Sequence, residues 1–156
     1  MHVNLLPVAG LVGVFHGRGR GAYPTISDFE YIEELTFADI GKPFLQYLQR
    51  TWAPDGEQLM HTESGFLRVG EDGHLEMTIA QPTGQTESCE GTLETDEDGV
   101  LTLTLQAKVT NTTTAKIVHD TRRTYFLRGD QLSTTFDMAA VGQEMTRHLT
   151  STLKRG

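Results

Sequence analysis

Apolar and polar side chains alternate with a period of two along most of this chain. Leucine takes every second position from Leu101 to Leu105, with threonine between, and the segment 74–80 repeats the pattern. Such alternation is typical of β-strands that bury one face, whereas helical periodicity is nearly absent. The pattern therefore predicts an all-β protein.

Short turn sequences separate the alternating segments. Asp-Gly pairs at 72–73 and 98–99 suit tight hairpin turns, because both residues tolerate a positive φ at low cost. We therefore expect about ten strands joined by hairpins. Their predicted ranges are 11–22, 29–38, 43–53, 59–69, 74–81, 84–95, 99–109, 115–128, 131–141 and 145–154.

Ten hairpin-linked strands in an open sheet would leave two exposed edges, and closure of the sheet removes them. We predict an antiparallel up-and-down β-barrel of about ten strands, similar to lipocalins and fatty-acid-binding proteins, in one domain covering residues 1–156. A barrel of this strand number can enclose a cavity for a small ligand. A β-sandwich is the alternative that the same pattern permits.

Composition and charge argue against several classes of protein. The net charge of −8 disfavours a nucleic-acid binder, which needs a basic surface. No apolar run approaches the roughly 18 residues of a membrane span, and no basic segment precedes the first apolar stretch, so we expect neither a membrane anchor nor a signal peptide. The single cysteine, Cys89, cannot form an internal disulfide, which favours a cytoplasmic location.

Glycine recurs at alternate positions near the N-terminus, where Gly17, Gly19 and Gly21 share one face of a predicted strand. No Lys-Ser/Thr pair and no helical pattern follow, so the motif is not a phosphate-binding loop. We expect these glycines to let the strand coil tightly at a corner of the barrel. Close approach of a ligand or of another backbone is the alternative.

Paired charges are expected at the surface. Adjacent residues on a strand point to opposite faces, so Glu33 and Glu34 do not form an acid/base pair, and we interpret them as solvated. The basic pair Arg122-Arg123 is likewise interpreted as a solvated face, with contact to an anionic ligand as the alternative.

None of the six histidines has the sequence spacing of a zinc site. A single imidazole cannot hold zinc alone, but it can serve as the one protein ligand of a haem iron. His74 follows Asp-Gly and is interpreted as a turn residue, and His2 belongs to the terminus. Four histidines lie inside predicted strands, where each could face an interior: His16, His61, His119 and His148.

Motifs spread over nearly the whole chain carry a resemblance to a known family. They include Gly13-x-Phe15-x-Gly17-x-Gly19, Tyr23-Pro-Thr-Ile26, Met60-His61-x-Glu63, Thr114-Ala-Lys116 and His148-Leu. In this order they resemble the nitrobindin family of haem-binding β-barrels. The family carries tryptophan where this chain has Phe15, which preserves aromatic packing but lacks the indole N–H.

The resemblance implies one ferric haem b per chain, with His148 as its proximal iron ligand. It further implies that Thr25 and Lys116 contact the haem, that Met60 and His61 line the cavity, and that no catalytic group acts beyond the haem iron. The implied activities are binding of nitric oxide and isomerisation of peroxynitrite to nitrate. A homodimer is also implied. Opposite the proximal ligand we expect apolar side chains.

Two functions of other classes remain open on the residues alone. The barrel could carry a fatty acid or another small apolar molecule, as lipocalin-like transporters do. It could also be an interaction module without a ligand, in which His148 simply packs against its neighbours.

Overall fold

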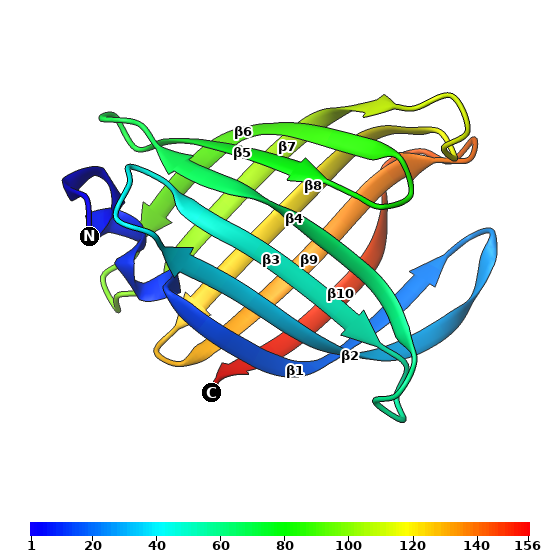
Figure 1. Ribbon diagram of the computed structural model, residues 1–156, viewed down its shortest axis with the longest axis horizontal. Coiled ribbons are helices and arrows are strands. Elements are labelled where there is room, and N and C mark those ends of the chain that lie inside the picture. The colour runs from blue at the N-terminus through cyan, green and yellow to red at the C-terminus, as the bar shows by residue number, and fades with distance from the viewer.

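The computed structural model describes residues 1–156, and it is a closed barrel of ten antiparallel strands (Figure 1). Each strand pairs with its neighbours in sequence, and β1 pairs with β10 to close the ring. The predicted up-and-down barrel is therefore confirmed, and the sandwich is excluded. The strands are β1 (Gly13–Tyr23), β2 (Ile26–Asp39), β3 (Leu45–Trp52), β4 (Leu59–Val69), β5 (His74–Ala80), β6 (Gln85–Thr95), β7 (Leu101–Asn111), β8 (Val118–Arg128), β9 (Gln131–Ala140) and β10 (Thr146–Arg155).

A 3₁₀ helix, η1 (Val3–Leu11), precedes β1 and was not predicted from the sequence. Its apolar residues Leu5, Val8 and Leu11 are fully buried, and the helix packs at one end of the barrel, near the label N in Figure 1. The spacing of three residues suits a 3₁₀ helix, in which every third side chain shares one face. No helix of the structure combines the length and the apolar character needed to cross a membrane.

The hydrophobic core occupies the half of the barrel nearest η1. Phe15, Phe37, Leu45 and Leu67 are all at most 1% exposed and belong to one cluster of 22 buried residues. Phe15 packs beneath the guanidinium of Arg155, whose Cζ lies 4.6 Å from the ring centroid. This aromatic position thus supports barrel closure without an indole N–H, and the opposite half of the barrel remains hollow.

The alternate glycines of β1 make room for aromatic rings of β2. A Cβ on Gly19 would lie 2.2 Å from the ring of Tyr31, and one on Gly21 would lie 2.0 Å from the ring of Phe29. A Cβ on Gly17 would meet the backbone oxygen of Thr152 at 2.1 Å. The glycines therefore allow β2 and β10 to pack closely against β1. This outcome agrees with the alternative of close approach, and the approaching groups are neighbouring strands of the same chain.

Candidate functional site

A cavity of about 650 Å³ opens at the end of the barrel opposite η1. This volume lies within the range of small-molecule and cofactor sites. Hairpins β1–β2, β3–β4, β5–β6, β7–β8 and β9–β10 all turn at this end. The five residues singled out by sequence all line the cavity: Thr25, Met60, His61, Lys116 and His148.

The five residues lie at different depths. Thr25, in the turn between β1 and β2, is exposed at the rim, and Met60 on β4 is 45% exposed. Lys116 was expected inside a strand, but β8 begins only at Val118, so Lys116 belongs to the preceding loop and is exposed. Its backbone oxygen accepts a hydrogen bond of 2.8 Å from Gln85, which anchors this loop to the cavity wall.

A β-bulge brings His148 into the cavity. Ser151 and Leu153 point inward, so strict alternation along β10 would direct His148 outward. The register between β10 and β9 shifts at this point, with Arg147 opposite Asp137 and Leu149 opposite Phe136. A bulge re-aims a side chain in this way, and both His148 and Leu149 line the cavity as a result.

The surroundings of His148 suit a metal ligand. Its Nδ1 lies 3.0 Å from the backbone oxygen of Ala22, so Nδ1–H donates there and Nε2 keeps its lone pair. The rings of Tyr23, Phe29 and Phe136 surround the imidazole at centroid distances of 5.4, 6.1 and 6.2 Å. Burial lowers the pKa of His148 below its usual value, although the bond to Ala22 opposes the shift. The imidazole is therefore neutral at pH 7, as iron coordination requires.

The wall across from β10 is polar, and not apolar as expected. Arg123 lies between two carboxylates, with contacts of 2.5 Å to Glu63 and 2.6 Å to Glu87. Tyr47 donates a hydrogen bond of 2.7 Å to Glu63, and Nε2 of His61 lies 3.3 Å from the same carboxylate. Although burial alone would raise the pKa of Glu63, the charge of Arg123 and the hydrogen bonds of His61 and Arg123 lower it to about 2.

Two surface predictions were wrong. Arg123 is 6% exposed and lies inside the barrel, while its neighbour Arg122 points outward to Asp137. Glu33 is 2% exposed and lines the cavity, while Glu34 pairs with Arg50 on the outer face. A sequence signal for Glu33 existed, because strand alternation places it on the same face as the buried Leu35 and Phe37.

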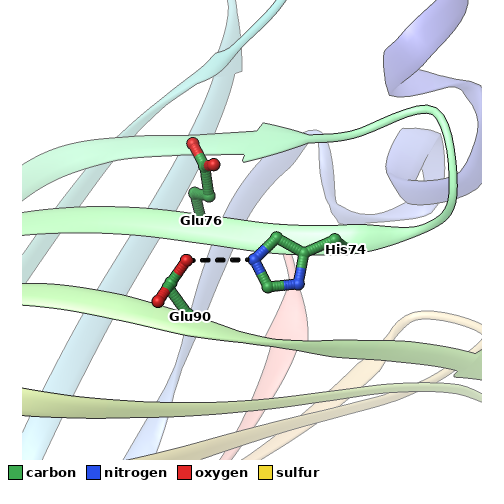
Figure 2. Close-up of side chains that lie close together, drawn as sticks. All are labelled: His74, Glu76 and Glu90. Carbon is green, nitrogen blue, oxygen red and sulfur yellow. Dashed lines mark hydrogen bonds and ion pairs between the residues drawn. The ribbon is translucent and has the colours of Figure 1, made fainter.

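A second group of possible ligand atoms lies on the outside of the barrel (Figure 2). His74, which was interpreted as a turn residue, is the first residue of β5, and its Nε2 lies 3.2 Å from Glu90 on β6. With Glu76 these side chains offer three ligand atoms within 4.8 Å of one another. All three are partly or fully exposed, and Glu76 also pairs with Arg68 at 3.4 Å. The group is adequately explained as a solvated cross-strand ion pair.

Comparison with known proteins gives consistent matches over the whole chain. A family model described as "THAP4-like, heme-binding beta-barrel domain" matches residues 4–155. "Peroxynitrite isomerase" of Nocardia farcinica is 43% identical over 156 residues, which are 99% of this chain and 92% of that protein. "Peroxynitrite isomerase 1" of Mycobacterium tuberculosis H37Rv is 42% identical over 155 residues, 97% of this chain and 94% of that protein.

A solved structure has the same fold. The crystal structure of Rv2717c from M. tuberculosis superposes with a TM-score of 0.96 at 41% sequence identity. The match covers 100% of this chain and 99% of that chain. The similarity thus extends to every strand of the barrel and to the hairpins that surround the cavity.

Proposed function

This chain belongs to the THAP4-like haem-binding β-barrel family, and from that premise we propose that it holds a haem through His148 and isomerises peroxynitrite to nitrate. The observation that carries the proposal is the state of His148. It is a neutral imidazole whose Nδ1 is engaged by Ala22, whose Nε2 is free, and which lines a large cavity. A histidine that merely packs would not need this arrangement.

The cavity fits a haem in size and in chemistry. About half of its lining residues are hydrophobic, among them Phe29 and Phe136 beside His148, which suits the faces of a porphyrin. Lys116 at the rim offers a cation for a propionate, and Thr25 offers a hydroxyl. The cavity thus offers a partner for each part of a haem. Its apolar walls suit the porphyrin, the imidazole suits the iron, and the polar groups at the opening suit the propionates.

Haem b, when bound, supplies a ferric iron at which peroxynitrite is converted to nitrate. The residues of this chain bind, orient and shield. The carbonyl of Ala22 fixes the tautomer and the ring orientation of His148. The three rings around the imidazole partly shield it from water, and Met60 and His61 line the space where a small ligand enters.

The charges in the cavity disfavour the fatty-acid carrier. A buried arginine could hold a fatty-acid carboxylate, but Arg123 is already bound by Glu63 and Glu87. A third carboxylate would therefore lie buried without a cation of its own, which is costly. This argument favours haem over an anionic lipid in the same cavity.

The proposal includes finer features. One cavity with one free imidazole per chain supports one haem per chain. The ferric state, nitric oxide binding, a homodimer and a cytoplasmic location are supported by the family resemblance alone.

Stopped-flow mixing with peroxynitrite tests the activity. Haem-loaded protein should accelerate the decay in proportion to its concentration and shift the product from nitrite toward nitrate. Haem-free protein at the same concentration is the control. Equal decay rates and equal nitrate yields for the two forms would overturn the proposed activity.

We expect Lys116→Ala to speed haem loss about two- to fivefold, because an exposed ion pair contributes up to about 1 kcal/mol. The rate is measured by transfer of haem to an excess of a high-affinity scavenger protein. Lys108→Ala, which removes an exposed lysine from β7 away from the cavity, is the matched control. If both variants lose haem at the wild-type rate, Lys116 does not hold a propionate.

A further inference from the structure

Two buried oxygen atoms of residues that line the cavity have no hydrogen-bond partner. They are Oε2 of Glu33 and Oε1 of Gln49, and both residues line the cavity. The side chains contact each other, with Nε2 of Gln49 donating to Oε1 of Glu33 at 3.4 Å. Glu33 is 2% exposed and Gln49 is 7% exposed. Buried polar atoms are almost always paired, so this floor of the cavity is incomplete as it stands.

The floor lies well below His148. Phe29 on β2 pairs with Gly21 on β1, and Gly21 pairs with Leu149 on β10. Because Leu149 follows His148 directly, Phe29 lies at about the same level of the barrel as His148. Glu33 pairs with Gly17 and lies four residues further along the same strand. Four residues correspond to roughly 13 Å along a strand. The floor therefore lies deeper in the barrel than the imidazole of His148.

The charges around the cavity floor favour a cationic ligand. Glu63 and Glu87 share the single guanidinium of Arg123, which leaves Glu33 without a cation. The interior thus carries three carboxyl groups for one arginine, and an anion would be repelled. When Glu33 is ionised, both orphan atoms are acceptors, so a guest that satisfies both must bring at least two hydrogen-bond donors on one small centre.

We propose that the cavity floor is a binding site for a protonated primary amine with a short apolar body. Its ammonium N–H groups donate to Oε2 of Glu33 and to Oε1 of Gln49. The body of the amine packs against the lining side chains of Leu35 and Tyr31 on the same strand. This site goes beyond haem binding and peroxynitrite isomerisation and does not depend on either.

The proposed site has a defined pH dependence. Burial raises the pKa of Glu33 to about 7, although the nearby hydroxyl of Ser151 and the amide of Gln49 oppose the shift. An amine remains protonated below about pH 10, and it binds the ionised form of Glu33. Affinity should therefore be constant above about pH 7 and fall about tenfold for each unit below it. The charged groups that act on the pKa of Glu33 are Glu63 and Arg123, and Glu33 in turn acts on the pKa of Tyr31. The other titratable groups of this interior are Glu87, Tyr47 and Tyr125, which surround Arg123, and His61, which lies beside Glu63.

Titration of the full haem-free chain with n-butylammonium chloride, followed by NMR of the Gln49 side-chain amide, tests the site. We expect a saturable shift of this resonance at pH 8. Butanol, which has the same length but no charge, should bind at least tenfold more weakly. Potassium chloride at equal ionic strength should give no saturable shift.

Glu33→Gln keeps the side-chain volume and removes the charge. It should weaken butylammonium binding about ten- to hundredfold, as expected for loss of a charge-assisted hydrogen bond, and abolish the pH dependence. Glu30→Gln, on the exposed face of the same strand, is the control and should bind as wild type does. If Glu33→Gln does not fold, the pH profile of butylammonium binding and the comparison with butanol, both measured on wild-type protein, test the site instead.

Three results would overturn the site: no saturable shift, equal affinity for butanol, or unchanged affinity in Glu33→Gln. The first would mean that water alone satisfies the two oxygens. Butylammonium binding to His148→Ala should equal that of wild type. Loss of haem binding by that variant therefore tests the haem assignment separately and leaves the amine site intact.

Discussion

Neighbouring side chains determine the protonation states of the buried glutamates in this barrel. Glu63 lies beside Arg123 and has a pKa of about 2, whereas Glu33 lacks a cation and has a pKa of about 7. Both are glutamates buried in the same barrel. The difference arises because Arg123 and the hydrogen bonds compensate the burial of Glu63, whereas burial dominates at Glu33.

Glu33→Gln should stabilise the protein more at pH 8 than at pH 4. Between its ordinary pKa of 4.5 and about 7, folded Glu33 keeps a proton that the unfolded chain releases, so wild-type stability falls as pH rises through this window. The difference corresponds to on the order of 3 kcal/mol. Denaturant unfolding at both pH values measures it. Glu30→Gln should show no such pH-dependent gain, and an equal gain for both variants would refute this account of Glu33.

The sequence predicted some cavity residues and missed others for identifiable reasons. His148, Lys116 and Thr25 were predicted because they lie in motifs that resemble those of a known family, and such motifs can be recognised from the sequence alone. Glu63 and Arg123 are 60 residues apart, and only the closed barrel brings them together. No local pattern distinguishes such a buried ion pair from two solvated charges.

At the scale of elements, β1 and β2 act together to place two of the aromatic rings, Tyr23 and Phe29, beside His148. Gly21 leaves room for Phe29, and Phe29 lies 6.1 Å from the imidazole. The sequence showed the alternate glycines but not the aromatic residues that pack against them. The order of the strands could be predicted, but the register, which determines which residues lie opposite each other, could not. The bulge at His148 also escaped prediction, since it depends on the pairing of β9 with β10.

Gly21→Ala should displace Phe29 and destabilise the fold by about 1–3 kcal/mol, the usual cost of overpacking. Haem retention should fall with it, because Phe29 shields His148. The double variant Gly21→Ala with Phe29→Leu should recover part of the lost stability, since the smaller side chain clears the new methyl group. Denaturant unfolding measures both. Purely additive losses would contradict the proposed contact.

The helix η1 provides a second test at this scale. Leu5 is fully buried against the core, and its neighbour Leu6 is 60% exposed. Leu5→Ala should cost about 2–5 kcal/mol of unfolding free energy, whereas Leu6→Ala should change it by no more than about 0.5 kcal/mol. The comparison uses denaturant unfolding of both variants. Similar values for the two would show that η1 does not cover the core.

At the scale of the whole molecule, the sequence predicted most of the architecture. Alternation and turns predicted ten strands whose bounds differ from the observed ones by at most three residues. Closure followed from the need to avoid exposed sheet edges. The helix was missed because a short apolar stretch before a strand does not reveal its own conformation. The division into a packed half and a hollow half depends on side-chain depth, which the sequence does not record.

Absorbance titration of the purified chain with ferric haem tests the central claim most directly. Wild-type protein should give a sharp Soret band that saturates at one haem per chain, because a free Nε2 of His148 lies in a cavity of sufficient size. His148→Ala should lose this band and keep the circular dichroism of a β-protein. An unchanged Soret band in folded His148→Ala would contradict the assignment of His148 as the iron ligand.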